Sequence, residues 1–202
     1  PGHGTLAADL ADRHGEDEAI QYQRLQDEGF RSLAKLAGRL PEDVEWAMEP
    51  HHVQVAAPER RREIETLVDV ARAAGTRYAS VEGVLGALGP GIRYEESAVV
   101  HPVRLLHALA RQVRRSGACL VQEAPVVAVD SDRDGVQAVR THDGPTLRAR
   151  HVLIATHAPV VDPDLHSFRM RVMRHHAIAL PADEPAGCTL TVTDSGTWST
   201  RD

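Results

Sequence analysis

The sequence predicts an α/β (α+β mixed) fold, in which a mixed sheet is combined with several helices. Two periods of apolar residues along the chain, with a change from one to the other near residue 117, support this prediction. Before residue 117, apolar residues recur at about every 3.6 positions, which is typical of amphipathic helices. After Gly117 the period falls to two, which is typical of strands that bury one face.

Four helices are predicted from the longer period, each bounded by Gly or Pro residues that commonly begin or end a helix. Their ranges are about 5–14, 16–40, 58–75 and 101–117.

Strands are predicted where short apolar runs alternate or lie between turn residues. These runs are 44–48, 53–57, 120–122, 125–130, 136–141, 146–149, 151–156, 172–180 and 189–193. The first two are expected to form a hairpin, and Asp143-Gly144 is expected to turn the chain so that 146–149 pairs back. Residues 151–156 read as a buried strand. Residues 83–91 read as a glycine-rich connection.

Composition excludes several classes of protein. The 202 residues carry a net charge of -6, which argues against nucleic-acid binding. The Arg60–Arg62 run lies among glutamates and is expected on the solvated side of a helix. No apolar run approaches the roughly 20 residues that cross a membrane. The two cysteines, Cys119 and Cys188, make no disulfide framework and are expected to be buried thiols, so a cytoplasmic location is expected.

Three patterns that suggest chemistry are weak. The spacing of Gly83, Gly86 and Gly89 does not match G-x-G-x-x-G. Asp194-Ser195-Gly196 lacks the surrounding elbow of a serine hydrolase. The pairs His51-His52 and His175-His176 are adjacent, and neighbouring strand residues point to opposite faces, so neither pair is expected to chelate a metal. No metal site is predicted.

The most informative stretch lies between residues 99 and 161. It reads VVHPVRLLHALARQVRRSGACLVQEAPVVAVD and then VRTHDGPTLRARHVLIATHAPV. This order of helix, strand, hairpin and small-residue turn resembles FAD-dependent oxidoreductases of the D-amino-acid-oxidase (DAO) family. ATHAPV, PGHGT, RHHAIALP and TDSGTWSTR are closest to the subgroup that often carries a Rieske domain. The resemblance implies partial FAD and substrate domains.

The resemblance also implies a division of the chain and a set of cofactor-binding residues. Residues 1–100 would be the helical and hairpin part, 101–161 the central flavin segment, and 162–202 part of the substrate sheet. Carried over by position, the flavin contacts are Gly2, His3, Gly4, Thr5, Val126, Ala155, Thr156 and His157. Val126 would contact adenine through its backbone, and His157 stands where the family usually has Gly or Asn.

The function implied is oxidation of a C–N bond of an amine or amino acid by hydride transfer to FAD. The chain reads as a fragment, because the family's G-x-G-x-x-G and C-terminal segment are not in it, so FAD binding is expected to be weak or absent and the isolated chain inactive. No catalytic acid or base is assigned. Four arginines are unranked candidates for a substrate carboxylate: Arg169, Arg171, Arg174 and Arg201. The alternative is a degenerate binding or scaffolding domain. Exposed edges predict a homo-oligomer.

Overall fold

The computed structural model describes residues 3–83, 89–131, 135–157, 168, 170, 178, 181, 188–193 and 197–200. The chain divides into two compact units. Unit 1 comprises Pro1–Arg115 and Ala182–Asp202, and unit 2 comprises Ser116–Pro181. The predicted division into 1–100, 101–161 and 162–202 stays a prediction, because compactness does not say which segment holds a cofactor.

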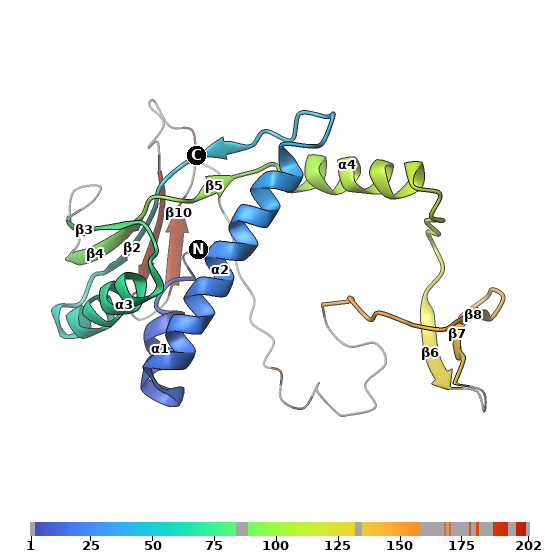
Figure 1. Cartoon of the computed structure of the whole chain (residues 1–202), viewed down its shortest axis with the longest axis horizontal. Helices are drawn as coiled ribbons and strands as arrows, with labels where there is room; N and C mark the ends of the chain where they lie inside the picture. Colours follow the sequence, from blue (N-terminus) through green and yellow to red (C-terminus); the bar gives the residue numbers. More distant parts are fainter. Residues whose placement is uncertain are drawn as a thin grey trace. The chain divides into compact units, whose positions relative to one another are not determined.

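All four predicted helices are confirmed (Figure 1). They are α1 (Leu6–His14), α2 (Glu16–Ala37), α3 (Arg61–Ala74, after a 3-10 turn at Pro58–Arg60) and α4 (Pro102–Arg115). The second helix ends three residues earlier than predicted. Arg39 N–H bonds to the Leu36 carbonyl and Leu40 N–H to that of Ala37, so the last turn tightens to three-residue spacing before Pro41.

A five-stranded mixed sheet is the centre of unit 1. Its order is β10-β9-β2-β4-β3. The strands are β2 (His51–Val55), β3 (Tyr78–Glu82), β4 (Pro90–Tyr94), β9 (Thr189–Thr193) and β10 (Thr197–Thr200). β2 pairs antiparallel with β4 and parallel with β9, which opposes His51 to Thr189.

The predicted hairpin between 44–48 and 53–57 is wrong. β1 (Ala47–Met48) pairs instead with β5 (Ala98–Val99) in a separate two-stranded sheet. The physical reason is that a strand has two edges, and β4 and β9 take both edges of β2. Strand β3 was not predicted, and β4 begins within residues 83–91, which read as a glycine-rich connection. Residues 84–88 lie outside the described residues.

The core of unit 1 lies between the sheet and three helices, with α1, α2 and α3 packed together beside the strands (Figure 1). Alternate residues of β2 and β4 face this core. It consists of Ala7, Ala8, Ala19, Val53, Val55, Ile64, Leu67, Val70, Ala71, Ile92 and Tyr94. Helices α1 and α2 contribute alanines to this core, whereas α3 contributes most of the large helical side chains. The small alanine side chains let α1 and α2 approach each other closely.

A buried polar link ties α2 to the segment after α3. The Asp27 carboxylate accepts hydrogen bonds from Gln23 Nε2 at 3.0 Å and from Thr76 Oγ1 at 2.6 Å. All three side chains are buried. Because buried polar groups cost free energy unless they are paired, this link fixes how α2 crosses the end of α3.

Unit 2 contains a three-stranded antiparallel sheet of β6 (Val126–Ser131), β7 (Gln137–Thr141) and β8 (Leu147–Ala149). This confirms three predicted strands and the turn before β8. Residues 120–122 and 151–156 form no strand, and Leu153 is 90% exposed, so the predicted buried strand is wrong. An apolar run becomes a strand only beside a partner strand, and no described strand pairs with it.

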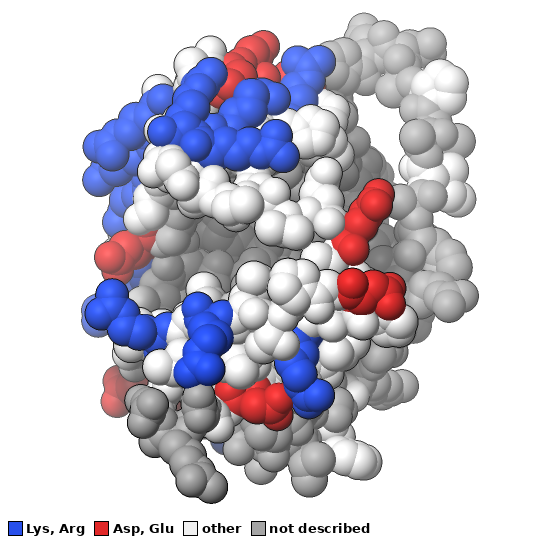
Figure 2. All heavy atoms as spheres, turned by 90° about the vertical axis from the view of Figure 1, so that its right-hand side faces the viewer, with Lys and Arg blue, Asp and Glu red and all other residues white. Residues whose placement is uncertain are grey.

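Charged side chains of both signs share the surface around α4. Figure 2 shows Lys and Arg side chains in both the upper and the lower part of the face that it draws, with Asp and Glu side chains among them. The α4 arginines pair with glutamates: Arg111 with Glu42 at 2.7 Å and Arg104 with Glu45 at 2.9 Å. Among the described residues, no helix is long and apolar enough to span a membrane.

The two cysteines differ in burial. Cys188 is buried, as predicted, whereas Cys119 is exposed, which corrects the prediction for that residue. Cys119 follows Gly117 in a segment that packs against no described core, so its apolar neighbours do not shield it.

We predict that Asp27→Ala destabilises the chain by about 2–3 kcal/mol, because Gln23 and Thr76 lose their partner while remaining buried. Urea unfolding followed by circular dichroism measures this loss. Glu28→Gln, at an exposed position of the same helix, is the control and should change stability by less than about 0.5 kcal/mol. Equal effects of the two substitutions would contradict the role of the link.

Candidate functional site

The predicted cofactor residues fall into two groups, one in each unit. His3, Gly4 and Thr5 lie in unit 1, and Val126 with the segment 155–157 lies in unit 2. Gly2 lies outside the described residues. The structure therefore brings predicted residues together only within each unit.

His3, Gly4 and Thr5 form the entrance to α1. Gly4 has a φ of 58°, a left-handed conformation that favours glycine and turns the chain into the helix. Thr5 is buried, and its carbonyl accepts the N–H groups of Ala8 and Asp9 at 2.9 and 3.1 Å. His3 Nδ1 contacts the hydroxyl of Tyr22 on α2. The segment is therefore fixed against the helices.

His51 is a residue that sequence reasoning left unassigned. Its Nδ1 lies 2.5 Å from Thr189 Oγ1, and its Nε2 lies 3.4 Å from Thr191 Oγ1. Burial, together with positive groups that include His52 and His3, lowers the pKa of His51 to about 4. The ring is therefore neutral at neutral pH, and it joins β2 to β9 on the helix side of the sheet.

The opposite face of β2 carries two buried polar side chains, His52 and Gln54, which are 6% and 0% exposed. They alternate with His51, Val53 and Val55, so the two adjacent histidines point to opposite faces, as predicted. His52 Nδ1 and Gln54 Oε1 have no hydrogen-bond partner. Such atoms are rare in folded proteins because each costs about 1–3 kcal/mol.

Beside His52 lies a charged pair on the same face. Arg93 is the direct cross-strand partner of His52, and its Nε and Nη2 donate to one oxygen of Glu95 at 2.9 and 2.6 Å. Burial and the charge of Arg93 lower the pKa of His52, while Glu95 opposes this effect. Both charged side chains remain partly exposed. This end of the face therefore combines an imidazole, a guanidinium and a carboxylate.

The position of the Gln54 side chain depends on the glycine opposite it on β4. Its cross-strand partner is Gly91, where an added Cβ would lie 2.5 Å from Gln54 Cγ and 2.8 Å from the Val53 carbonyl. The Gln54 amide donates to the Gly89 carbonyl at 3.2 Å. Glycine at position 91 is therefore required for Gln54 to lie across β4.

In unit 2, Val126 begins β6 at an irregularity. The β6–β7 register shifts between Val126 and Ala128, so Val127 has no partner on β7 and is half exposed. A bulge of this kind frees backbone groups from the ladder and is common beside functional sites. Val126 itself pairs with Thr141, so the backbone that the bulge frees is that of Val127, and the contact of Val126 with adenine stays a prediction.

Ala155, Thr156 and His157 are exposed and lie outside any strand. His157 has a φ of 63°, a left-handed conformation that favours Gly and Asn and costs a histidine free energy. The resemblance predicts Gly or Asn at this place, and these are residues that adopt the left-handed conformation readily; the flavin contact of His157 stays a prediction.

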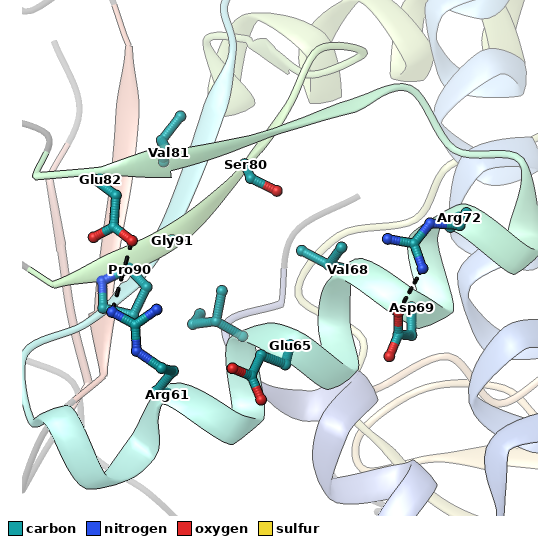
Figure 3. A pocket seen from close by; sticks show the side chains of 11 residues that line it. Arg61, Glu65, Val68, Asp69, Arg72, Ser80, Val81, Glu82, Pro90 and Gly91 are labelled. Atoms are coloured by element: carbon teal, nitrogen blue, oxygen red, sulfur yellow. Dashed lines mark hydrogen bonds and ion pairs between the residues drawn. The ribbon is translucent and has the colours of Figure 1, made fainter.

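A groove of about 480 Å³ lies between α3 and strands β3 and β4 (Figure 3). Its lining includes Arg61, which pairs with Glu82 at 3.7 Å, and Arg72, which pairs with Asp69 at 2.7 Å. These pairs are well exposed, and no predicted site residue lines the groove. We place the candidate site on the β2–β4 face because two of its buried side chains, His52 and Gln54, carry polar atoms without hydrogen-bond partners; neither this face nor the groove holds a cofactor residue that the sequence predicted. In the described part of the chain, no cluster of three or more His, Cys, Asp or Glu is arranged to hold a metal.

Comparison with known proteins decides the family. The model of the family described as "FAD dependent oxidoreductase" (DAO) matches residues 3–199. The chain belongs to this family. Among solved structures, the chain is similar to that of glycine oxidase from Geobacillus kaustophilus, with a TM-score of 0.61 and 19% sequence identity. No significant match is found among curated proteins.

The structural match covers 90% of this chain and 55% of the glycine oxidase chain. It confirms the predicted α/β fold class. Because the chain spans about half of that relative, the match supports the arrangement of elements and leaves the activity to be tested. The subgroup with a Rieske domain stays a prediction.

We predict that Gly91→Ala destabilises the chain by about 1–3 kcal/mol, because its Cβ meets Gln54 and the β2 backbone. Adding Gln54→Ala should restore part of the loss by removing Cγ. Gly29→Ala is the control: nothing lies within 4 Å of its Cβ, and alanine favours the helix, so it should not destabilise. Thermal unfolding measures all three, and a neutral Gly91→Ala would contradict the packing described.

We predict an acid-dependent loss of stability that depends on His51. The His51 ring takes up a proton near pH 6.5 in the unfolded chain and near pH 4 in the folded chain. The contribution of neutral His51 to folding stability is therefore complete above pH 6.5 and is lost as the pH falls towards 4. The loss is up to about 3 kcal/mol. His51→Gln should flatten this part of the unfolding profile, whereas His14→Gln, at an exposed position of α1, should not. Identical profiles for all three proteins would contradict the assignment.

Proposed function

We propose that the chain forms the substrate side of an FAD-dependent oxidoreductase that oxidises the C–N bond of an amine or amino acid. The observation that carries this proposal is the polar face of β2 and β4 within a fold of the DAO family. The face places His52, Arg93 and Glu95 together on a sheet whose other face is filled by helices. Such a surface suits a small polar substrate, because few convergent polar groups on a rigid sheet fix its orientation.

The residues proposed to hold FAD are those that the resemblance to the DAO family implies by position. In unit 2 these are Val126 at the bulge and Ala155, Thr156 and His157, and in unit 1 they are Gly2, His3, Gly4 and Thr5. The flavin, when bound, supplies the hydride acceptor. The contribution of the chain is to bind and orient the substrate and to exclude water from it.

Within these 202 residues there is no G-x-G-x-x-G, the motif whose amides and helix dipole hold a dinucleotide pyrophosphate. We therefore propose that residues 1–202 alone retain FAD weakly and are inactive by themselves. We also propose a reducing, cytoplasmic location, which is supported by Cys119 and Cys188 forming no disulfide in the described part of the chain. Self-association through sheet edges is also proposed, and light scattering tests it.

We predict that residues 1–202, mixed with excess FAD and then desalted, lose the visible absorbance of the flavin. The complete product of the gene that encodes them should retain it, and anaerobic addition of an amine or amino acid should bleach it, because hydride transfer reduces the flavin. Visible spectroscopy of both proteins is the measurement. A gene product that binds no FAD would favour a degenerate binding domain, and flavin that no amine or amino acid bleaches would contradict the proposed chemistry.

A further inference from the structure

Strand β3 lies at one edge of the five-stranded sheet (Figure 1), and in the part of the chain that the structure describes no strand pairs with its outer side. Natural sheets commonly protect such edges with proline, lysine or a bulge. β3 contains neither of these residue types, and it pairs with β4 without a shift of register. Its outer edge is therefore open to another strand.

The hydrogen bonds to β4 determine which backbone groups of β3 point outward. The Glu95 N–H bonds to the Arg77 carbonyl at 3.1 Å, and the Gly83 N–H bonds to the Gly89 carbonyl at 3.4 Å. Residues along an antiparallel ladder alternate between hydrogen-bonded and non-hydrogen-bonded pairs. The residues of β3 that turn their N–H and carbonyl groups to the open edge are therefore Tyr78, Ser80 and Glu82.

The side chains of these three residues point to the side of the sheet that carries α3. Ser80 is the cross-strand partner of Ile92, which belongs to the core between the sheet and the helices. Residues two apart on a strand share a face, so Tyr78 and Glu82 point the same way. Ser80 and Glu82 line the groove beside α3. A strand added to the edge of β3 would therefore lie along this groove.

Opposite charges lie at the two ends of β3 (Figure 3). Glu82 pairs with Arg61 at 3.7 Å. At the other end, hydrogen bonding to Tyr78 and to Asp69 raises the pKa of Arg72, so this guanidinium lies beside Tyr78. The side chains of Glu82 and Arg72 are 70% and 65% exposed, which leaves both accessible to a further charge. A second β3 in the reverse direction would set an acid against a base at each end.

We propose that β3 pairs antiparallel with β3 of a second copy of this chain, about a twofold axis at Ser80. In this register Ser80 faces the partner's Ser80, and Tyr78 faces the partner's Glu82. All the outward N–H and carbonyl groups of both strands then find partners, and no like charges are opposed. The partner's Glu82 also comes beside Arg72. Such an isologous contact closes at two copies.

This inference rests on the self-association proposed above, which it narrows to one edge and one register. It does not depend on the flavin chemistry. A protein that fails to dimerise leaves the proposed oxidation standing, and flavin that no amine or amino acid bleaches leaves the dimer standing.

The first test is sedimentation equilibrium of the complete product of the gene that encodes this chain, with and without Ser80→Pro. Proline removes the outward N–H of residue 80, which β4 does not use, so the β3–β4 ladder is kept. The dissociation constant of the dimer should rise at least about tenfold. Ser80→Ala keeps the N–H and is the matched control, so it should leave the constant unchanged. Circular dichroism checks that each variant is folded.

A second test uses the charges at the two ends. Arg72→Glu would oppose two carboxylates in the dimer and Glu82→Lys two cations, so each variant alone should dissociate at least about tenfold more readily. An equimolar mixture of the two should dimerise again, because one end then carries the inverted pair and the other end the original pair. Light scattering after size exclusion measures this. Arg62→Glu, on α3 but outside the groove, is the control and should remain dimeric.

Several results would overturn the proposal. They are a monomeric wild-type protein, a dimer that survives Ser80→Pro, dissociation in either control, and a mixture of the two charge variants that does not associate. An assembly larger than two copies would place the contact on another edge and would overturn it as well. Recovery in the mixture cannot come from refolding of either variant, because each carries its own substitution unchanged.

Discussion

The pairing of β2 on both of its edges is the constraint on which unit 1 depends. The parallel ladder to β9 joins residues that are 138 positions apart at His51 and Thr189, and the antiparallel ladder to β4 completes the sheet. Loop closure over such a distance is costly in entropy, so the contact must be supported by burial. The valines of β2 supply that burial against α1, α2 and α3.

A central strand whose two faces differ in chemistry explains the location of the candidate site. Val53 and Val55 face the helices, whereas His52 and Gln54 face the other way without enough partners. Because the side-chain period of a strand is two, a shift of one residue in register would exchange these sets and place polar atoms in the core. The fold therefore fixes the polar face, and Gly91 preserves it by leaving room for Gln54.

Helices were predictable from the sequence because their signals are local: apolar period, flanking Gly and Pro, and length. The opposite orientation of His51 and His52 was predictable for the same reason. Strand partners were not predictable from the sequence, because pairing depends on residues that are distant along the chain. The expected hairpin and the expected buried strand at 151–156 are therefore both wrong. Strand β4, which carries Arg93, was missed because it begins in the glycine-rich stretch 83–91. The left-handed conformation of His157 has no local sequence signal.

We propose that the β2–β4 face, rather than the α3 groove, receives the ligand. Chemical-shift mapping by NMR of the isotopically labelled chain during titration with glycine distinguishes the two surfaces. The largest shifts are expected on His52, Arg93 and Glu95, with contacts from the glycine methylene protons to their side chains. Shifts concentrated on α3 and β3, or spread evenly over the surface, would contradict it.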